Sequence, residues 1–386
     1  MRVMILPDPD FLARERGMLG RMEVGLADEG VRVIHAVPLS SDSVEAAGVY
    51  STQLSYQDKG LPLTLGVRAA GVVRAVREAL PTDNAEDRLI DAIYVAGERA
   101  WPMGFEIGRQ VGAAVLLEVW RPGAGCSVAS QAVGWTRKLS AKSVLRGLSI
   151  RLLAPDNPTA ALLRKDVPAA LVPLVPWGVH PGEFEQSART RPGGATTVLL
   201  HATGSDPLAV RAAIEGLARV AAQRPDIHVL VDAWATRAMP LWSWASGSSL
   251  TSRMSVISDS EGRRELPLHA DMLMVPEATG EHRSIVLDAL ASRTLVLAAR
   301  DVMVEWLSDD RTALLVDRAE PEVFAGALLS VLGEGPGGRG AQLREAAFAD
   351  IRDRRLGSTQ VRALLSVCDG LAESAAGQPR YGGTDA

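Results

Sequence analysis

The sequence predicts an α/β protein built from two halves, each a parallel sheet with helices on both faces. Two sets of alternating strand-like and helix-like segments carry this prediction, one within residues 2–120 and one from residue 198 onward. Between them, residues 185–197 have no apolar period and are rich in Arg, Pro and Gly, which indicates a linker. The 386 residues are also too many for one ordinary core, so we expect two domains.

The first half contains short apolar runs that predict strands and longer stretches with apolar residues three or four apart that predict helices. We expect strands at residues 2–6, 31–37, 89–95 and 113–120. We expect helices at residues 12–29, 65–80 and 101–112. Strands that alternate with helices in this way form a parallel sheet, because each helix carries the chain back across a face of the sheet.

The second half repeats the pattern. We expect strands at residues 198–201, 227–231 and 254–257, and a helix at residues 207–224 with Pro207 in its first turn. Two more helices are expected at residues 341–351 and 359–373. The remaining residues at the C-terminus are small, polar and rich in glycine, so we expect them to fray.

Composition excludes several classes of protein. The chain is 47% hydrophobic and 23% charged, which is globular rather than disordered. The net charge is −5 with no basic block, so nucleic acid is not an expected partner. No apolar run approaches the length of a membrane span or a signal sequence, which leaves only peripheral membrane contact open. Two distant cysteines predict neither a disulfide framework nor a cysteine zinc site and fit a cytoplasmic location.

The most informative segment covers residues 269–298. It reads as a buried strand, a polar loop, a helix and a second buried strand, which is how an open α/β sheet builds a ligand crevice at its strand ends. Ser284 is suited to cap the helix that carries Asp288. A helix start offers unpaired N–H groups and a positive dipole end, which suits a diphosphate. A capped helix beside a solvated loop would give the same pattern.

This segment resembles, without a gap, the signature of the family-four retaining glycosyltransferases. The matching positions are Asp271, Pro276, Gly280, Asp288-Ala289-Leu290-Ala291 and Thr294-Leu295-Val296. A second stretch, residues 172–184, resembles the strand with which that family leaves its first domain, through Pro176, Gly178, Val179 and Phe184. The resemblance spans roughly residues 90–335.

The resemblance implies the GT-B fold, which is two Rossmann-like domains facing an interdomain cleft. The implied parts are an acceptor-side domain at 1–184, a linker at 185–197, a nucleotide-sugar donor domain at 198–335, C-terminal helices at 336–375 of which the last returns to the N-terminal domain, and a flexible tail at 376–386. It also implies transfer of a sugar from a nucleotide-diphosphate donor, with retained anomeric configuration and without an essential metal or other cofactor.

The departures from the family pattern concern the donor site. The first family acid, which contacts the donor sugar, falls on Gly280, with Glu281 beside it; the second, which holds the ribose, falls on Asp288. The family's Arg and Lys, which meet the diphosphate, fall near Thr203 and Leu208, and neither residue is basic. Because a departing diphosphate needs positive charge, other arginines must replace the missing pair in an active enzyme.

Two sets of candidate residues follow. The donor-binding candidates are Asp288, Glu281, His282, Arg283, Ser284, Thr203, Gly204, Ser205, Arg263 and Arg264. The catalytic candidates are Glu281 and Glu98, the latter placed after the strand that contains residues 93–95. Arg211 is a further substitute for the missing cations, although a surface arginine is usually only solvated.

The sequence therefore predicts a hexosyltransferase with a nucleotide-sugar donor and an unidentified acceptor. The alternative is a catalytically inactive GT-B-like protein that binds a nucleotide sugar or a protein partner, which the missing cations and the missing acid favour. A more distant alternative is another two-domain α/β enzyme, such as a nucleotide-sugar epimerase.

Overall fold

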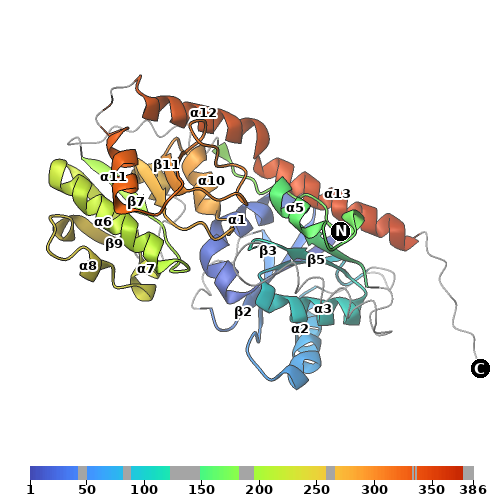
Figure 1. Ribbon diagram of the computed structural model, residues 1–386. Coiled ribbons are helices and arrows are strands. Elements are labelled where there is room, and N and C mark those ends of the chain that lie inside the picture. Colours follow the sequence, from blue (N-terminus) through green and yellow to red (C-terminus); the bar gives the residue numbers. More distant parts are fainter. Residues whose placement is uncertain are drawn as a thin grey trace, which may run out of the picture. The chain divides into compact units, whose positions relative to one another are not determined.

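The computed structural model describes residues 1–41, 50–80, 88–121, 148–181, 195–257, 266–332, 334 and 337–376, and these form two compact units. One unit contains the described residues up to Trp177 and those from Gly357 onward. The other contains the described residues within Gly178–Leu356. Each unit is a sheet flanked by helices (Figure 1).

The first unit is a six-stranded parallel sheet of order β3-β2-β1-β4-β5-β6. Its strands are β1 (Arg2–Pro7), β2 (Arg32–Pro38), β3 (Ser51–Tyr56), β4 (Ala92–Ala96), β5 (Ala114–Glu118) and β6 (Ile150–Leu153). Its helices are α1 (Pro9–Asp28), α2 (Leu65–Ala79), α3 (Trp101–Val111), α5 (Asn157–Leu163) and α13 (Gly357–Ala376), with short 3-10 turns at Pro62–Thr64, Glu98–Ala100 and Ala169–Leu171.

Helix α1 links the central strand to the last helix of the chain. Asp8 caps α1 by accepting a 2.7 Å hydrogen bond from the backbone nitrogen of Phe11. Further along, α1 packs against α13 so closely that a Cβ added at Gly25 would lie 2.6 Å from Cγ2 of Val361. The glycine is therefore required here by helix contact and not by backbone conformation.

The second unit repeats the arrangement, with strand order β12-β11-β10-β7-β8-β9. Its strands are β7 (Thr196–Leu200), β8 (Ile227–Asp232), β9 (Met254–Ile257), β10 (Met272–Val275), β11 (Leu295–Ala299) and β12 (Leu314–Val316). Its helices are α6 (Pro207–Gln223), α7 (Ala233–Ala238), α8 (Leu241–Trp244), α9 (Leu266–His269), α10 (Ser284–Ala291), α11 (Pro321–Leu329) and α12 (Arg339–Arg354), with a 3-10 turn at Thr251–Arg253.

All described strand pairs in both sheets are parallel, which confirms the predicted α/β class with two Rossmann-like sheets. In each sheet, successive strands are first added on one side of the first strand and then on its other side. This switch point lies between β1 and β4 in the first sheet and between β7 and β10 in the second. β7 begins at Thr196, two residues before the expected start of the donor domain. The rest of the expected linker, up to residue 194, and the expected tail beyond Ala376 lie outside the described residues.

Candidate functional site

The loops after β7 and β10 lie next to each other at the switch point of the second sheet. β7 pairs with β10 in parallel with Leu200 opposite Met274, so both strands end at the same edge. The backbone nitrogen of His201 then donates a 3.0 Å hydrogen bond to the carbonyl of Met274. This edge is where a doubly wound sheet binds its ligand, because helix starts and loop groups converge there.

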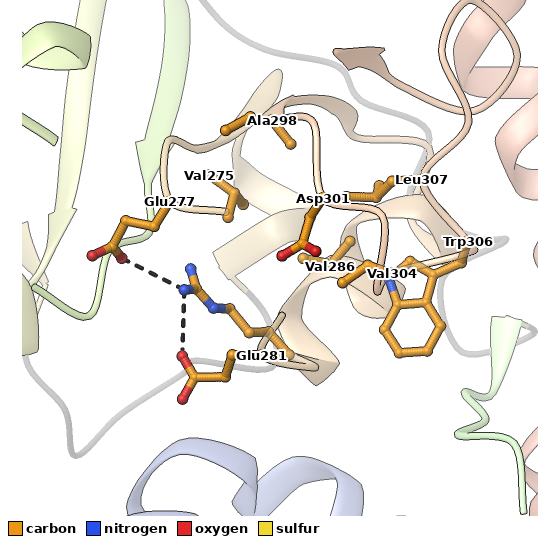
Figure 2. A pocket seen from close by; sticks show the side chains of 11 residues that line it. Val275, Glu277, Glu281, Val286, Ala298, Asp301, Val304, Trp306 and Leu307 are labelled. Carbon is orange, nitrogen blue, oxygen red and sulfur yellow. Dashed lines mark ion pairs between the residues drawn. The ribbon is translucent and has the colours of Figure 1, made fainter. Parts of the chain in front are cut away.

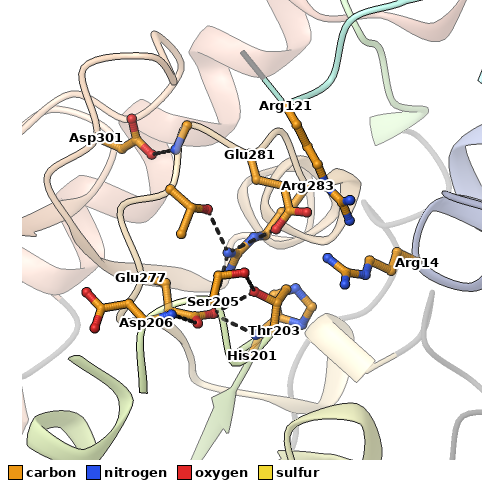
Figure 3. A network of polar contacts seen from close by, with 12 residues as sticks. Arg14, Arg121, His201, Thr203, Ser205, Asp206, Glu277, Glu281, Arg283 and Asp301 are labelled. Atoms are coloured by element: carbon orange, nitrogen blue, oxygen red, sulfur yellow. Dashed lines mark hydrogen bonds and ion pairs between the residues drawn. The ribbon is translucent and has the colours of Figure 1, made fainter. Parts of the chain in front are cut away.

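A carboxylate of the protein occupies the start of α6. Oε2 of Glu277 accepts hydrogen bonds from the backbone nitrogen of Thr203 at 2.6 Å and from Thr203 Oγ1 at 3.1 Å. Oε1 of Glu277 accepts one from the backbone nitrogen of Asp206 at 2.9 Å. Ser205 Oγ lies 2.9 Å from Thr203 Oγ1, and Gly204 between them has a φ of 83° (Figure 3). Of the predicted donor-binding residues Thr203, Gly204 and Ser205, Thr203 therefore binds a carboxylate of the protein itself.

Arg283 completes this network from the loop after β10. Its Nη2 lies 3.5 Å from Oε2 of Glu277 and 3.3 Å from Oε2 of Glu281, and it donates a 3.4 Å hydrogen bond to Thr279 Oγ1. The residue is only 4% exposed. Its Nε and Nη1 are buried and have no hydrogen-bond partner among the described residues. The predicted candidates Glu281 and Arg283 therefore meet Thr203 through Glu277, which the sequence analysis did not select.

Gly280 explains why the first family acid is absent. Its backbone φ is 70°, a left-handed conformation that side chains with a Cβ resist. Its backbone nitrogen donates a 2.6 Å hydrogen bond to Oδ2 of Asp301, which holds the loop in that conformation. The loop is therefore built around glycine at this position, and the neighbouring Glu281 points its carboxylate toward Arg283 (Figure 2).

The start of α10 differs from the prediction in one respect. Ser284 is the first residue of the helix, and the capping position belongs to Arg283, whose side chain makes no cap hydrogen bond. The prediction that Ser284 caps the helix is wrong, because extended backbone ends at Arg283 (φ −135°, ψ 116°) and Ser284 is already helical. Asp288 lies one turn further along α10 and is 4% exposed. Its contact with a ribose stays a prediction.

A small pocket is lined in part by the Glu277–Arg283–Glu281 network (Figure 2). Its lining mixes ionic groups with apolar ones, including Val286, Asp301 and Trp306. His282 is fully buried and packs edge-on against Trp306, with ring centroids 5.2 Å apart. His282, a donor-binding candidate, therefore packs against a residue that lines the pocket.

The other candidate cations lie elsewhere. Arg263 and Arg264 are outside the described residues. Arg211 pairs with Glu215 at 2.8 Å one turn along the exposed face of α6, and Leu208, at the family's lysine position, is 78% exposed. Among the described candidates for replacing the missing pair, Arg283 is the one buried at the switch point.

Glu98 lies in the first unit, in the 3-10 turn after β4. Burial raises the pKa of its carboxyl above the ordinary value, and the nearby carboxylates of Asp8 and Asp10 raise it further, while its own backbone N–H and Arg121 oppose the change. Burial also raises the pKa of Asp8. Arg121 pairs with Asp10 at 2.6 Å. A carboxyl with a raised pKa at a strand end has the properties of a general acid or base.

Among the described residues, no group of three or more His, Cys, Asp or Glu side chains is arranged to hold a metal ion. Within the same part of the chain, no helix has the length and apolar character to cross a membrane.

No family model and no curated protein matches this sequence, but solved structures match it over nearly its whole length. A glycosyltransferase from Rickettsia africae superposes with a TM-score of 0.67 at 14% identity, covering 96% of this chain and 98% of its own. HepE from Anabaena, solved with UDP-glucose, gives a TM-score of 0.67 at 12% identity, covering 97% and 100%. Sucrose-phosphate synthase from Thermosynechococcus elongatus gives 0.70 at 14% identity, also covering 97% and 100%.

These likenesses confirm the predicted fold: the chain is a GT-B protein with two Rossmann-like units, structurally similar to nucleotide-sugar glycosyltransferases. At identities of 12–14% the likeness extends to the fold alone, so function has to be argued from the residues of the site.

Proposed function

We propose that this chain is a hexosyltransferase that takes its sugar from a nucleotide-diphosphate donor held at the strand ends of the second unit. The observation that carries the proposal is Arg283, a buried guanidinium at the switch point of a doubly wound sheet, whose Nε and Nη1 have no hydrogen-bond partner among the described residues. Such a fork matches the paired oxygens of a phosphate.

The donor class is supported by the structural neighbours. HepE of Anabaena has been solved in complex with UDP-glucose, and its chain and this one cover each other almost completely. We propose the same class of donor for this chain. The acceptor is unidentified, and a cytoplasmic location is likewise proposed on the low cysteine content.

Each proposed role uses one chemical property. Arg283 neutralises the diphosphate as it leaves, replacing the absent Arg and Lys of the family pattern. Asp288 accepts hydrogen bonds from the ribose hydroxyls. Glu98, whose pKa is raised, and Glu281 are the candidates for proton transfer. Retention of configuration and independence of metal follow from the family resemblance.

The experiment is donor turnover across a panel of nucleotide sugars, with varied acceptors. We expect Arg283→Ala to lower turnover at least ~100-fold, as the loss of one donor to a developing oxyanion does elsewhere. Arg211→Ala is the matched control, because Arg211 pairs with Glu215 on the exposed face of α6, and it should leave turnover unchanged. Equal turnover in wild type and Arg283→Ala would remove Arg283 from the phosphate site.

Asp288→Ala is the second arm of the experiment. We expect it to weaken nucleotide binding about tenfold or more, because a carboxylate that accepts ribose hydrogen bonds contributes roughly 1.5–3 kcal/mol. Unchanged nucleotide affinity by calorimetry, in a variant shown to be folded, would exclude Asp288 from the site.

A second function is favoured by two observations: the left-handed Gly280 where the family has its sugar-contacting acid, and the carboxylate of Glu277 at the start of α6. These fit a GT-B protein that binds a nucleotide sugar or a protein partner without chemistry. If the wild type binds donors and turns none over with any acceptor, this second function replaces the first.

A further inference from the structure

We infer that the start of α6 is an oxyanion site whose resident anion is Glu277, and that a phosphate binds there only by displacing this carboxylate. The inference deepens the proposed function, on which it rests for the class of ligand. It assigns Glu277 a role as the residue that sets whether the site is open to phosphate.

The first argument is the set of donors around Glu277. Two backbone N–H groups, of Thr203 and Asp206, and the hydroxyl of Thr203 all point at one carboxylate that is 4% exposed. The two N–H groups belong to Asp206, the N-cap residue of the 17-residue helix α6, and to Thr203 in the loop before it; the first turn of the helix is itself capped by Asp206 Oδ1, which accepts a 3.1 Å hydrogen bond from the backbone nitrogen of Ala209. A tetrahedral oxyanion needs the same converging donors that now hold Glu277.

The second argument is independent and comes from Arg283. Its guanidinium is as buried as Glu277, yet Nη2 makes all its described contacts while Nε and Nη1 have no hydrogen-bond partner among the described residues. Buried N–H donors normally have a hydrogen-bond acceptor. The two nitrogens of Arg283 that lack one among the described residues therefore indicate a ligand that would accept from them. A phosphate beside Nη2 could bring the oxygens that a single carboxylate of Glu277 does not supply.

The third argument is charge. The network sets two carboxylates, of Glu277 and Glu281, against one guanidinium, so a further anion would meet net negative charge. If a phosphate replaces the Glu277 carboxylate at the backbone N–H groups of Thr203 and Asp206, these groups and Arg283 bind the ligand together.

The experiment measures the affinity of inorganic pyrophosphate for the full chain by calorimetry, with the ligand-induced shift in thermal unfolding as a check on folding. Glu277→Ser removes the carboxylate and leaves the backbone N–H groups of Thr203 and Asp206 without this acceptor. Glu277→Gln removes the charge but keeps an acceptor at the amides. Glu281→Gln is the matched control, since it removes an equal charge from the same guanidinium without touching the start of α6.

We expect Glu277→Ser to bind pyrophosphate at least ~10-fold more tightly than wild type, Glu277→Gln to fall between them, and Glu281→Gln to stay within about threefold of wild type. Should Glu277→Ser be unstable without ligand, the intermediate affinity of Glu277→Gln remains the test. The inference is overturned if wild type binds as tightly as both Glu277 variants, or if Glu281→Gln gains as much as Glu277→Ser. If Glu277→Ser binds pyrophosphate but no nucleotide sugar, the inference stands and the transferase proposal fails.

Discussion

Tyr94 donates a 2.7 Å hydrogen bond from its hydroxyl to Oε2 of Glu118, and both side chains are completely buried in the first unit. The indole nitrogen of Trp177 donates to the other oxygen, Oε1, at 3.0 Å. Burial raises the pKa of Tyr94 well above its ordinary value, and the neighbouring Glu118 raises it further, so the phenol remains a donor. The carboxyl of Glu118, at the end of β5, is thus bound by Tyr94 of β4 and by Trp177.

Removing the hydroxyl of Tyr94 should destabilise the protein more than removing a tyrosine hydroxyl that donates to a neutral carbonyl. We expect Tyr94→Phe to lower the free energy of unfolding by about 1.5–3 kcal/mol, because it leaves a buried carboxyl short of a donor. Tyr56→Phe is the control, since Tyr56 donates at 2.7 Å to the carbonyl of Pro7, and it should cost about 0.5–1.5 kcal/mol. Denaturant unfolding followed by fluorescence measures both, and equal losses would contradict the prediction.

The contact between α1 and α13 predicts opposite signs for two glycine substitutions in one helix. At Gly20 nothing lies within 4 Å of an added Cβ, so Gly20→Ala should raise the free energy of unfolding by roughly 0.5–1 kcal/mol through helix propensity. At Gly25 the added methyl would lie 2.6 Å from Val361, so Gly25→Ala should lower it by about 1–3 kcal/mol. Thermal unfolding of the two variants is the measurement. A stabilised Gly25→Ala would show that α13 does not pack as described.

Cys368 predicts a loss of stability at alkaline pH. Its thiol, 5% exposed in α13, has its pKa raised by burial from 9.0 to about 12. Between these values the unfolded chain releases the proton and the folded chain keeps it, so the free energy of unfolding falls as pH rises, by at most ~1.4 kcal/mol per pH unit. Below pH 9 the thiol is protonated in both the folded and the unfolded chain, so it does not make the free energy of unfolding depend on pH.

The matched variant is Cys368→Ala. Its unfolding free energy should fall less steeply than that of wild type above pH 9, while the two curves run parallel below it. Urea unfolding at a series of pH values, under reducing conditions, gives both slopes. Identical slopes above pH 9 would mean that the folded thiol titrates normally.

Restoring the family's acid at Gly280 should damage the site and leave its activity unimproved. A non-glycine residue at a φ of 70° costs roughly 1–2 kcal/mol, so Gly280→Glu should lower the melting temperature without raising donor turnover. Gly280→Asn is the control, because asparagine tolerates the left-handed region and should be less destabilising. A Gly280→Glu variant as stable as Gly280→Asn would show that this loop does not need its present backbone.

The sequence was a good guide wherever a local pattern decides the structure. The expected strand at 254–257 is β9, and the expected helices at 65–80 and 207–224 differ from α2 and α6 by a residue at their ends. β3 was missed, because Ser51–Tyr56 is mostly polar and only partly buried at the sheet edge, where apolar alternation is not required.

The site was harder to predict, because its central contact joins distant residues. Glu277, the residue after Pro276, was not selected as a site residue. Nothing local to Glu277 reveals that Thr203 and Asp206 supply its hydrogen bonds, since β7 and β10 become neighbours only in the folded sheet. Arg283 was selected as a loop cation, but its burial and its pairing with Glu277 and Glu281 could not be read from the sequence around it.

Helix α13 belongs to the first unit but is translated after the second, which affects folding during synthesis. The ribosome releases β1 and α1 early, but α13 emerges only after the whole segment Gly178–Leu356 has been translated. At about 5–20 residues per second, that interval lasts roughly 10–35 seconds. Throughout it the surface of α1 around Gly25 lacks its partner helix, and by its end every described strand of the second unit has been translated. The nascent protein should therefore finish its later half first and expose a bare helix face to chaperones in the meantime.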